Sequence, residues 1–258
     1  MNSRKGLSLV IPAWNEEARL RATLDRYLPA LESTHSPFEV VVVADGSTDR
    51  TVEVAQRYRS RGVRLITSSA KLGKGKAVLT GLQAASYEFS GFIDADGPVL
   101  PEDLMTLVKA LENCDCAIAS RKVVGSRIVI PRTLARRLLS RVWNLAARGL
   151  LLLQVRDTQC GAKFFRTSSL ERIIHEVAVS DWAFDVSILF HIKEQGMSVR
   201  EVPVTWIEKS GSKLDIVRDV PRMLIALVGI RIMSSPIASQ LSKRMVVRAR
   251  TDDVLADA

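Results

Sequence analysis

Short apolar segments alternate with segments of helical spacing throughout the first half of the chain. The apolar segments cover residues 7–13, 38–44, 63–67, 89–93 and 116–119. Helical spacing is found between them, over 16–31, 51–60, 76–86 and 101–112. Apolar strands that alternate with helices are typical of βαβ units, in which helices cover both faces of a mostly parallel sheet. The alternation therefore predicts an α/β fold with right-handed crossovers.

Polar side chains follow the first, second and fourth of these predicted strands. The three loops begin with Trp14-Asn15-Glu16, Asp45-Gly46-Ser47-Thr48-Asp49 and Asp94-Ala95-Asp96. Parallel strands end at the same edge of a sheet, and ligands of open α/β sheets bind in the crevice outside those ends. We therefore expect the three loops to lie together at a ligand site.

Asp94 and Asp96 stand two residues apart, directly after an apolar strand that Gly97-Pro98 ends. In extended backbone two such carboxylates point the same way. Paired carboxylates suit Mg²⁺ or Mn²⁺, which is usually held by one or two carboxylates together with substrate phosphates. A solvated turn is the alternative, and the Asp-x-Asp pattern alone favours it. The position of the pair in the order of elements favours the metal site.

The second half of the chain is less regular. Its patterns predict helices over 133–153, 168–177, 184–195 and 220–233, a polar turn over 157–161 and a strand over 198–206. No linker divides the chain, which predicts a single domain over 1–240 that includes a C-terminal amphipathic helix at 220–233. Residues 241–258 show no pattern, and we expect a disordered tail there.

The positive charge of the chain is concentrated in one span. The formal net charge is +9, yet the residues from Cys116 to Arg156 include no Asp or Glu. The cations of this span are Arg121, Lys122, Arg127, Arg132, Arg136, Arg137, Arg141, Arg148 and Arg156. A segment this one-sided favours contact with phosphates or anionic lipid over a merely solvated basic face. A basic nucleic-acid-binding protein is a further alternative, against which stand an aromatic content of 5% and the lack of a stacking motif.

The predicted helix 133–153 has two different faces. Arg137, Arg141 and Arg148 share one face, and Leu138, Val142, Leu145 and Leu152 form an opposing apolar stripe. Together with helix 220–233, this basic face is expected to hold the protein on an anionic bilayer without spanning it, because no run reaches about 18 apolar residues. A buried core helix is an equal alternative for 220–233. Three cysteines indicate a reducing compartment, so we expect a cytoplasmic protein, peripheral on the cytoplasmic face of a membrane.

Two common nucleotide motifs are incomplete in this chain. Gly73-Lys74-Gly75-Lys76 resembles a phosphate-binding loop but lacks the full P-loop spacing. The first predicted strand-to-helix turn also lacks the glycine fingerprint of dinucleotide-binding folds. The sequence therefore predicts a sheet of the kind that binds nucleotides, with acidic residues on its loops and without either glycine motif.

The motifs of both halves, taken together, resemble those of a known enzyme family. Val10-Ile11-Pro12-Ala13-Trp14-Asn15-Glu16-Glu17, Ala44-Asp45-Gly46-Ser47-Thr48-Asp49, Gly73-Lys74-Gly75 and Asp94-Ala95-Asp96 resemble glycosyltransferase family 2, which has the Rossmann-like GT-A fold. In the second half, Ser120-Arg121, the arginine-rich helix with Asn144, Phe184-Asp185 and Gly211-Ser212-Lys213 resemble the polyprenyl-phosphate sugar synthases. Asp157-Thr158-Gln159-Cys160-Gly161 is most similar to the dolichyl-phosphate β-glucosyltransferases.

The resemblance implies roles for individual residues. The nucleotide would be lined by Pro12, Trp14, Glu16, Val43 and Asp45, and Asp94, Ala95 and Asp96 would hold Mg²⁺ or Mn²⁺ and the diphosphate. Arg121 would meet phosphate, and Lys213 would close over it. The acceptor phosphate and lipid would face Arg132, Arg136, Arg137 and Arg141. Pro98 stands where mannosyl-type members often have Gln, which leaves the third metal contact open.

The implied reaction is an inverting transfer of a hexose, with UDP-glucose expected as donor and a polyprenyl or dolichyl monophosphate as acceptor. GDP-mannose is the main rival donor. The acceptor phosphate is an anion at pH 7 and needs no strong base, which fits the interpretation of His35, His175 and His191 as surface or packed side chains. A hydroxyl acceptor is the alternative, and it would need Asp157 or Asp185 as a base. The oligomeric state is left open.

Overall fold

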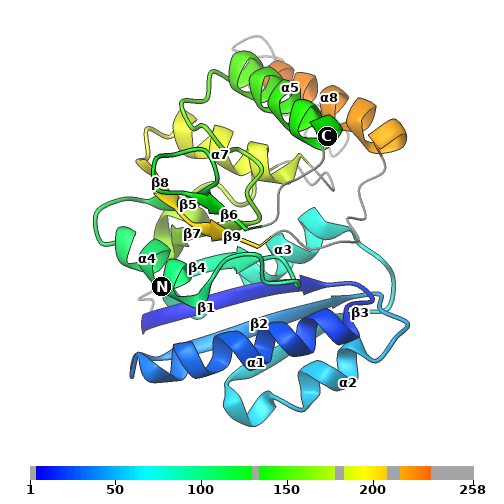
Figure 1. Cartoon of the computed structure of the whole chain (residues 1–258), viewed down its shortest axis with the longest axis vertical. Coiled ribbons are helices and arrows are strands. Elements are labelled where there is room, and N and C mark those ends of the chain that lie inside the picture. The colour runs from blue at the N-terminus through cyan, green and yellow to red at the C-terminus, as the bar shows by residue number, and fades with distance from the viewer. Residues whose placement is uncertain (1–3, 130–133, 178–182, 208–215, 234–258) are drawn as a thin grey trace, which may run out of the picture.

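A computed structural model describes residues 4–129, 134–177, 183–207 and 216–233 (Figure 1). Its strands are β1 Arg4–Ala13, β2 Phe38–Asp45, β3 Val63–Ser68, β4 Tyr87–Ile93, β5 Cys116–Ser120, β6 Arg127–Ile128, β7 Ala162–Arg166, β8 Val199–Pro203 and β9 Thr205–Trp206. Its α-helices are α1 Glu17–Ser33, α2 Thr51–Gln56, α3 Lys74–Gln83, α4 Pro101–Ala110, α5 Leu134–Leu151, α6 Thr167–Glu171, α7 Phe184–Glu194 and α8 Ile216–Met233. The predicted tail 241–258 lies outside the described residues.

The main sheet has seven strands in the order β3-β2-β1-β4-β7-β5-β8. All neighbouring pairs are parallel except those of β7, which runs antiparallel to both β4 and β5. The prediction of a mostly parallel sheet flanked by helices is therefore confirmed. Strand β7 was missed, because five residues with Lys163 among them do not form a continuous apolar run.

The two faces of the sheet pack against different helices. In β1, Leu9 and Ile11 join a core with α1, α2 and α4, whereas Val10 joins a second core with α3 and α7. Successive side chains of a strand point to opposite faces, so a strand covered on both sides must be apolar throughout. This explains why the first-half strands were readable as unbroken apolar runs.

The second half differs from its prediction in three places. The expected helix 168–177 is reduced to the short α6, which ends at Glu171. The expected strand 198–206 is divided into β8 and β9, and β9 leaves the main sheet to pair with β6. Helix α8 begins earlier than expected, at Ile216.

Helices α5 and α8 lie side by side at the end of the molecule opposite α1 and α2 (Figure 1). Helix α5 turns Trp143, Ala147 and Leu151 into the core, and α8 turns Met223, Leu227 and Ile230 into the same core. The side chains of the predicted α5 stripe point elsewhere: Val142 is 58% exposed and Leu145 is 73% exposed. Among the described residues, none of the helices has the length and apolarity needed to cross a bilayer.

Candidate functional site

The loops after β1 and β2 are joined by side-chain hydrogen bonds. The Asn15 side chain accepts a bond from the backbone N–H of Thr48 at 2.8 Å, and the Asn15 N–H donates to Ser47. The Glu16 N–H donates to the Thr51 hydroxyl at 2.8 Å. The two loops at the carboxyl edge of the sheet are therefore held as one unit, as their place at the ends of neighbouring parallel strands predicts.

Asp45, at the end of β2, fixes the loop that leads into α3. Its buried carboxylate accepts hydrogen bonds from the backbone N–H groups of Leu72, at 2.5 Å, and Gly73, at 2.9 Å. Gly46 follows with a φ of +62° and lies so close to Lys71 that a side chain would collide with its backbone. Asp45 thus orders the Gly73-Lys74-Gly75 segment, a role that the sequence did not reveal.

The other predicted nucleotide residues have different surroundings. Trp14 is half-buried, and the Lys71 ammonium lies 3.2 Å from the centre of its ring, a cation–π contact. Glu16 forms an ion pair with Arg19 at 2.9 Å. Pro12 is half-buried in β1, whereas the Val43 side chain packs in the core beneath α3 instead of lining an open surface.

Asp94, Ala95 and Asp96 follow β4 directly. Ala95 is buried and its carbonyl accepts a bond from the Thr23 hydroxyl at 2.8 Å, while Asp94 and Asp96 are half-buried. Gly97 turns the chain with a φ of +56°, beside Arg26. Helix α1 therefore supports the back of this loop and leaves the two carboxylates at the sheet edge.

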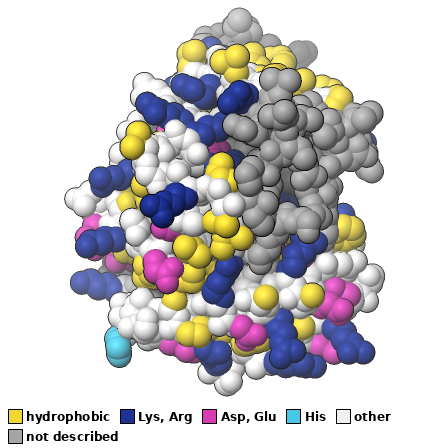
Figure 2. All heavy atoms as spheres, viewed as in Figure 1, with side chains coloured by type: hydrophobic (Ala, Val, Ile, Leu, Met, Phe, Trp, Pro, Cys, Tyr) yellow, Lys and Arg dark blue, Asp and Glu magenta, His cyan; other side chains and the backbone are white. Residues whose placement is uncertain are grey.

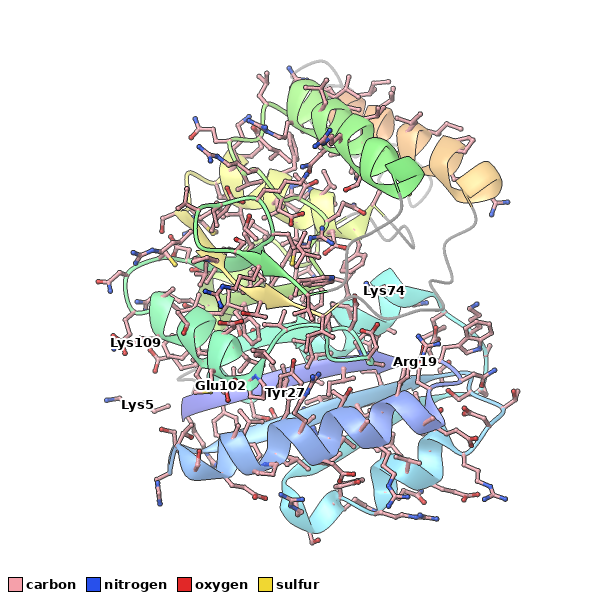
Figure 3. All side chains as sticks on the ribbon, in the orientation of Figure 1. Lys5, Arg19, Tyr27, Lys74, Glu102 and Lys109 are labelled. Atoms are coloured by element: carbon pink, nitrogen blue, oxygen red, sulfur yellow. The ribbon has the colours of Figure 1, made fainter. Side chains whose placement is uncertain are left out.

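Lys74, the first residue of α3 and labelled in Figure 3, forms an ion pair with Asp94. Its Nζ lies 2.6 Å from Asp94 Oδ1. Burial alone would lower the pKa of Lys74, but the carboxylates of Asp94, Asp185 and Asp96 outweigh it and raise that pKa. The site therefore holds a permanent positive charge beside the paired acids.

Strand β7 and the residue before it bring Gly161 against Asp94 and Lys163 against Asp185. The Asp94 N–H donates to the Gly161 carbonyl at 3.1 Å, and a side chain at position 161 would collide with the Asp94 carboxylate. Lys163 is fully buried and donates to Asp185 at 2.6 Å and to the Cys160 carbonyl at 2.8 Å. Gly161 thus fixes the start of the Asp94 loop, and only the pairing of β7 with β4 reveals this contact.

Arg121 is bound by Asp157 in a bidentate ion pair. The two nitrogens Nε and Nη2 donate to the carboxylate at 2.7 Å each, and the Arg121 N–H donates a third bond. Burial alone would raise the pKa of Asp157, but the charge and hydrogen bonds of Arg121 lower it to about 2. Asp157 is therefore unsuited to accept a proton at neutral pH, which argues against its alternative role as a general base.

Helix α5 is tied to the segment that carries Asp157. The buried Asn144 side chain accepts bonds from the N–H and the hydroxyl of Thr158, at 3.1 and 2.7 Å. The Asp157 N–H donates to Glu201 at 3.0 Å. Residues 157–163 therefore connect α5, Arg121 and Asp94 within one short stretch of chain.

The predicted acceptor residues are only partly described. Arg141 is exposed on α5. Arg132 and Lys213 lie outside the described residues, and so do the side chains of Arg136 and Arg137. Their roles stay predictions.

The paired acids suit a divalent metal. Asp94 already holds one cationic group, and one or two carboxylates together with substrate phosphates are a common donor set for Mg²⁺. Within the described part of the chain, no third His, Cys, Asp or Glu joins them in a cluster of metal-binding side chains. Asp94 and Asp96 would hold the metal, and a bound diphosphate would supply further oxygens.

Comparison with known proteins gives several matches. Residues 8–174 match the family described as "Glycosyl transferase family 2". The human protein named dolichyl-phosphate beta-glucosyltransferase is 35% identical over 231 residues, which cover 81% of this chain and 70% of that protein. Its namesake from Saccharomyces cerevisiae is 30% identical over 246 residues, covering 87% and 74%. These matches confirm the similarity to dolichyl-phosphate β-glucosyltransferases that the Asp157-Thr158-Gln159-Cys160-Gly161 motif predicted.

Solved structures show the same fold. Glucosyl-3-phosphoglycerate synthase from Mycobacterium tuberculosis, solved with Mn²⁺, UDP-glucose and phosphoglyceric acid, is 22% identical and has a TM-score of 0.67, with 88% of this chain and 79% of that chain covered. S. aureus TarS, solved with UDP-GlcNAc, has a TM-score of 0.60 at 19% identity, over 90% and 67% of the two chains. The sheet with its acidic loops, and the family match over most of its length, identify this chain as a glycosyltransferase that belongs to glycosyl transferase family 2.

Proposed function

We propose that this enzyme transfers glucose from UDP-glucose to a dolichyl or other polyprenyl monophosphate, with inversion and with Mg²⁺ or Mn²⁺. The similarity over 81% of the chain to the human dolichyl-phosphate beta-glucosyltransferase is the main support for donor sugar and acceptor. The carboxylates of Asp94 and Asp96 beside Lys74 support a bound nucleotide diphosphate. A bound metal would neutralise charge on the leaving diphosphate.

The residues of the site would have different roles in this reaction. The Asp45-ordered loop places Lys74 where a donor phosphate would meet it, and Asp94 and Asp96 would hold the metal. Direct attack of the acceptor phosphate from the face opposite the leaving group would give a β-linked product from an α-linked donor. The acceptor is already an anion, so the ion pair of Asp157 with Arg121 takes away no base that this chemistry needs.

The lipid acceptor requires a place for an apolar chain, and the α5–α8 end offers one. Among the described residues, the exposed large hydrophobic side chains all lie in the segment 124–129, which contains β6, on α5 or just after it, and on α8. Figure 2 shows hydrophobic side chains gathered where Figure 1 places α5 and α8, with Lys and Arg side chains nearby. We therefore propose that this end rests on the cytoplasmic face of an anionic membrane, and that the buried faces of both helices belong to the core.

Membrane binding should depend on both charge and apolar contact. Replacing Leu145 and Ile225, which are 73% and 71% exposed, with Gln should weaken flotation with anionic vesicles by at least about tenfold, because each buried aliphatic side chain contributes about 1.5–3 kcal/mol. Arg141→Gln should weaken it by about fivefold, from about 1 kcal/mol per cation near an anionic surface. Arg21→Gln, on α1 at the opposite end, serves as the control and should have no effect. Equal binding to neutral and anionic vesicles at low and high salt would contradict the electrostatic part.

The function itself is tested by offering donor and acceptor in combination. The purified enzyme is incubated with UDP-glucose or GDP-mannose and with either a polyprenyl monophosphate or the matching polyprenol, in the presence of Mg²⁺. We expect a glucosyl polyprenyl phosphate with a β linkage from the first pair, by mass spectrometry and digestion with anomer-specific glycosidases. If GDP-mannose gives product and UDP-glucose does not, the donor is GDP-mannose. If the polyprenol is glycosylated and the polyprenyl monophosphate is not, the acceptor group is a hydroxyl. Nucleic-acid binding in a gel shift without any sugar transfer would overturn the enzyme assignment.

A further inference from the structure

We propose that the Lys74 ammonium forms an ion pair with the Asp94 carboxylate before donor and metal bind, and so competes with the metal for that carboxylate. When donor and metal bind, the ammonium group moves to the donor diphosphate. Metal binding then depends on donor binding. The proposal rests on the proposed function for the identity of the diphosphate. It concerns a residue whose sequence motif, Gly73-Lys74-Gly75, indicated phosphate without saying how Lys74 would act.

The geometry of Lys74 allows such a movement. The backbone at the start of α3 is fixed, because Asp45 binds the N–H groups of Leu72 and Gly73. The Lys74 side chain is 25% exposed and that of its partner Asp94 is 30% exposed. The ammonium group can therefore exchange partners by rotation of its own side chain, without movement of the loop.

The second lysine of this cluster is placed differently. Lys163 is completely buried and is bound at once by Asp185 and the Cys160 carbonyl. Leaving these partners would strand an unpaired buried charge, which is strongly unfavourable. Lys163 therefore stays with Asp185, and Lys74 is the lysine that can exchange its partner.

Electrostatics give the direction of the exchange. A divalent cation and an ammonium group on one carboxylate repel each other, so Lys74 opposes metal binding to the free enzyme. A diphosphate offers Lys74 charge-assisted hydrogen bonds and offers the metal additional oxygens. Each ligand thus removes the obstacle to the other, and the coupling between them must be reciprocal.

The experiment measures Mn²⁺ binding directly, by electron paramagnetic resonance of free Mn²⁺, with no turnover involved. Wild type, Lys74→Met and Lys76→Met are titrated with and without UDP. Lys76 is the control, because it is exposed on the same helix. Without UDP, Lys74→Met should bind Mn²⁺ about tenfold more tightly than wild type, the factor expected when one charged hydrogen bond no longer competes. UDP should tighten Mn²⁺ binding less in Lys74→Met than in wild type, and Lys76→Met should match wild type.

Mn²⁺ binding to Lys74→Met that is equal to or weaker than that of wild type, in the absence of UDP, overturns the proposal. So does the failure of both proteins to bind Mn²⁺. Lys74→Gln provides a second neutral variant in case Lys74→Met does not fold, as judged by its thermal melt. GDP in place of UDP separates the two hypotheses: coupling with GDP alone would refute the UDP donor and leave the role of Lys74 supported, since the nucleotide-free titration does not depend on the base.

Discussion

Asp96→Ala is expected to lower sugar transfer by about three orders of magnitude, because charge stabilisation by a metal at the leaving diphosphate is worth several kcal/mol. The fold should persist, since Asp96 is half-buried in a loop at the sheet edge and outside the apolar core. Wild-type transfer should fall to the same level in excess chelator and return with Mg²⁺ or Mn²⁺. Initial rates of lipid glycosylation, with circular dichroism and thermal melts of both proteins, are the measurements.

A matched acid tests whether the effect is specific. Glu102, exposed in the first turn of α4, lies away from Lys74 in Figure 3, and Glu102→Gln should leave the rate unchanged. Full turnover of the wild type in chelator would refute the metal assignment while leaving the donor and acceptor assignments open to their own tests. A rate of Asp96→Ala within a few-fold of wild type would remove Asp96 from the site.

Asp157→Asn is expected to lower the free energy of unfolding by about 3–5 kcal/mol, because breaking a buried ion pair leaves its partner charge uncompensated. Asp157 and Arg121 are only 1% and 6% exposed, so water cannot replace the lost bonds. Denaturant unfolding at pH 7 measures the change. The pair formed by Arg61 and Glu32 is the control, because it has the same two-bond geometry at 2.8 Å on an exposed surface. Glu32→Gln should change stability little.

The same ion pair predicts a pH dependence of stability. The pKa of Asp157 is lowered from its ordinary 3.8 to about 2 in the folded protein. A carboxylate with a depressed folded pKa stabilises the fold fully above its unfolded pKa, and the contribution is lost as the pH falls through the folded value. The stability difference between wild type and Asp157→Asn should therefore be constant above pH 5 and shrink as the pH falls from about 4 to about 2. A difference that persists unchanged at pH 2 would show that packing, and not the charge, stabilises this pair.

Much of the fold and the main acids of the site were predictable from local patterns. The central parts of strands β1 and β2 are covered on both faces by helices, so they are apolar at nearly every position, and such runs are visible in a sequence. The loop acids Asp45, Asp94 and Asp96 follow the ends of these strands and of β4, and the parallel order places those ends together. The glycosyltransferase assignment follows from such local motifs, whose spacing along the chain suffices to identify them.

Tertiary structure alone decided how those residues are held. Strand β7 inserts between β4 and β5 by pairing with residues far away in the sequence, and it brings Gly161 against Asp94 and Lys163 against Asp185. Asp45 binds backbone N–H groups of a distant loop, and Asp157 binds Arg121 across 36 positions. Which apolar face of α5 is buried was likewise set by its packing against the core, since Trp143, Ala147 and Leu151 turn inward and Leu145 does not. Side-chain type and spacing determine which helix, strand or loop each local segment can form. Which distant side chain or backbone group a residue contacts depends on distances that exist only once the chain has folded.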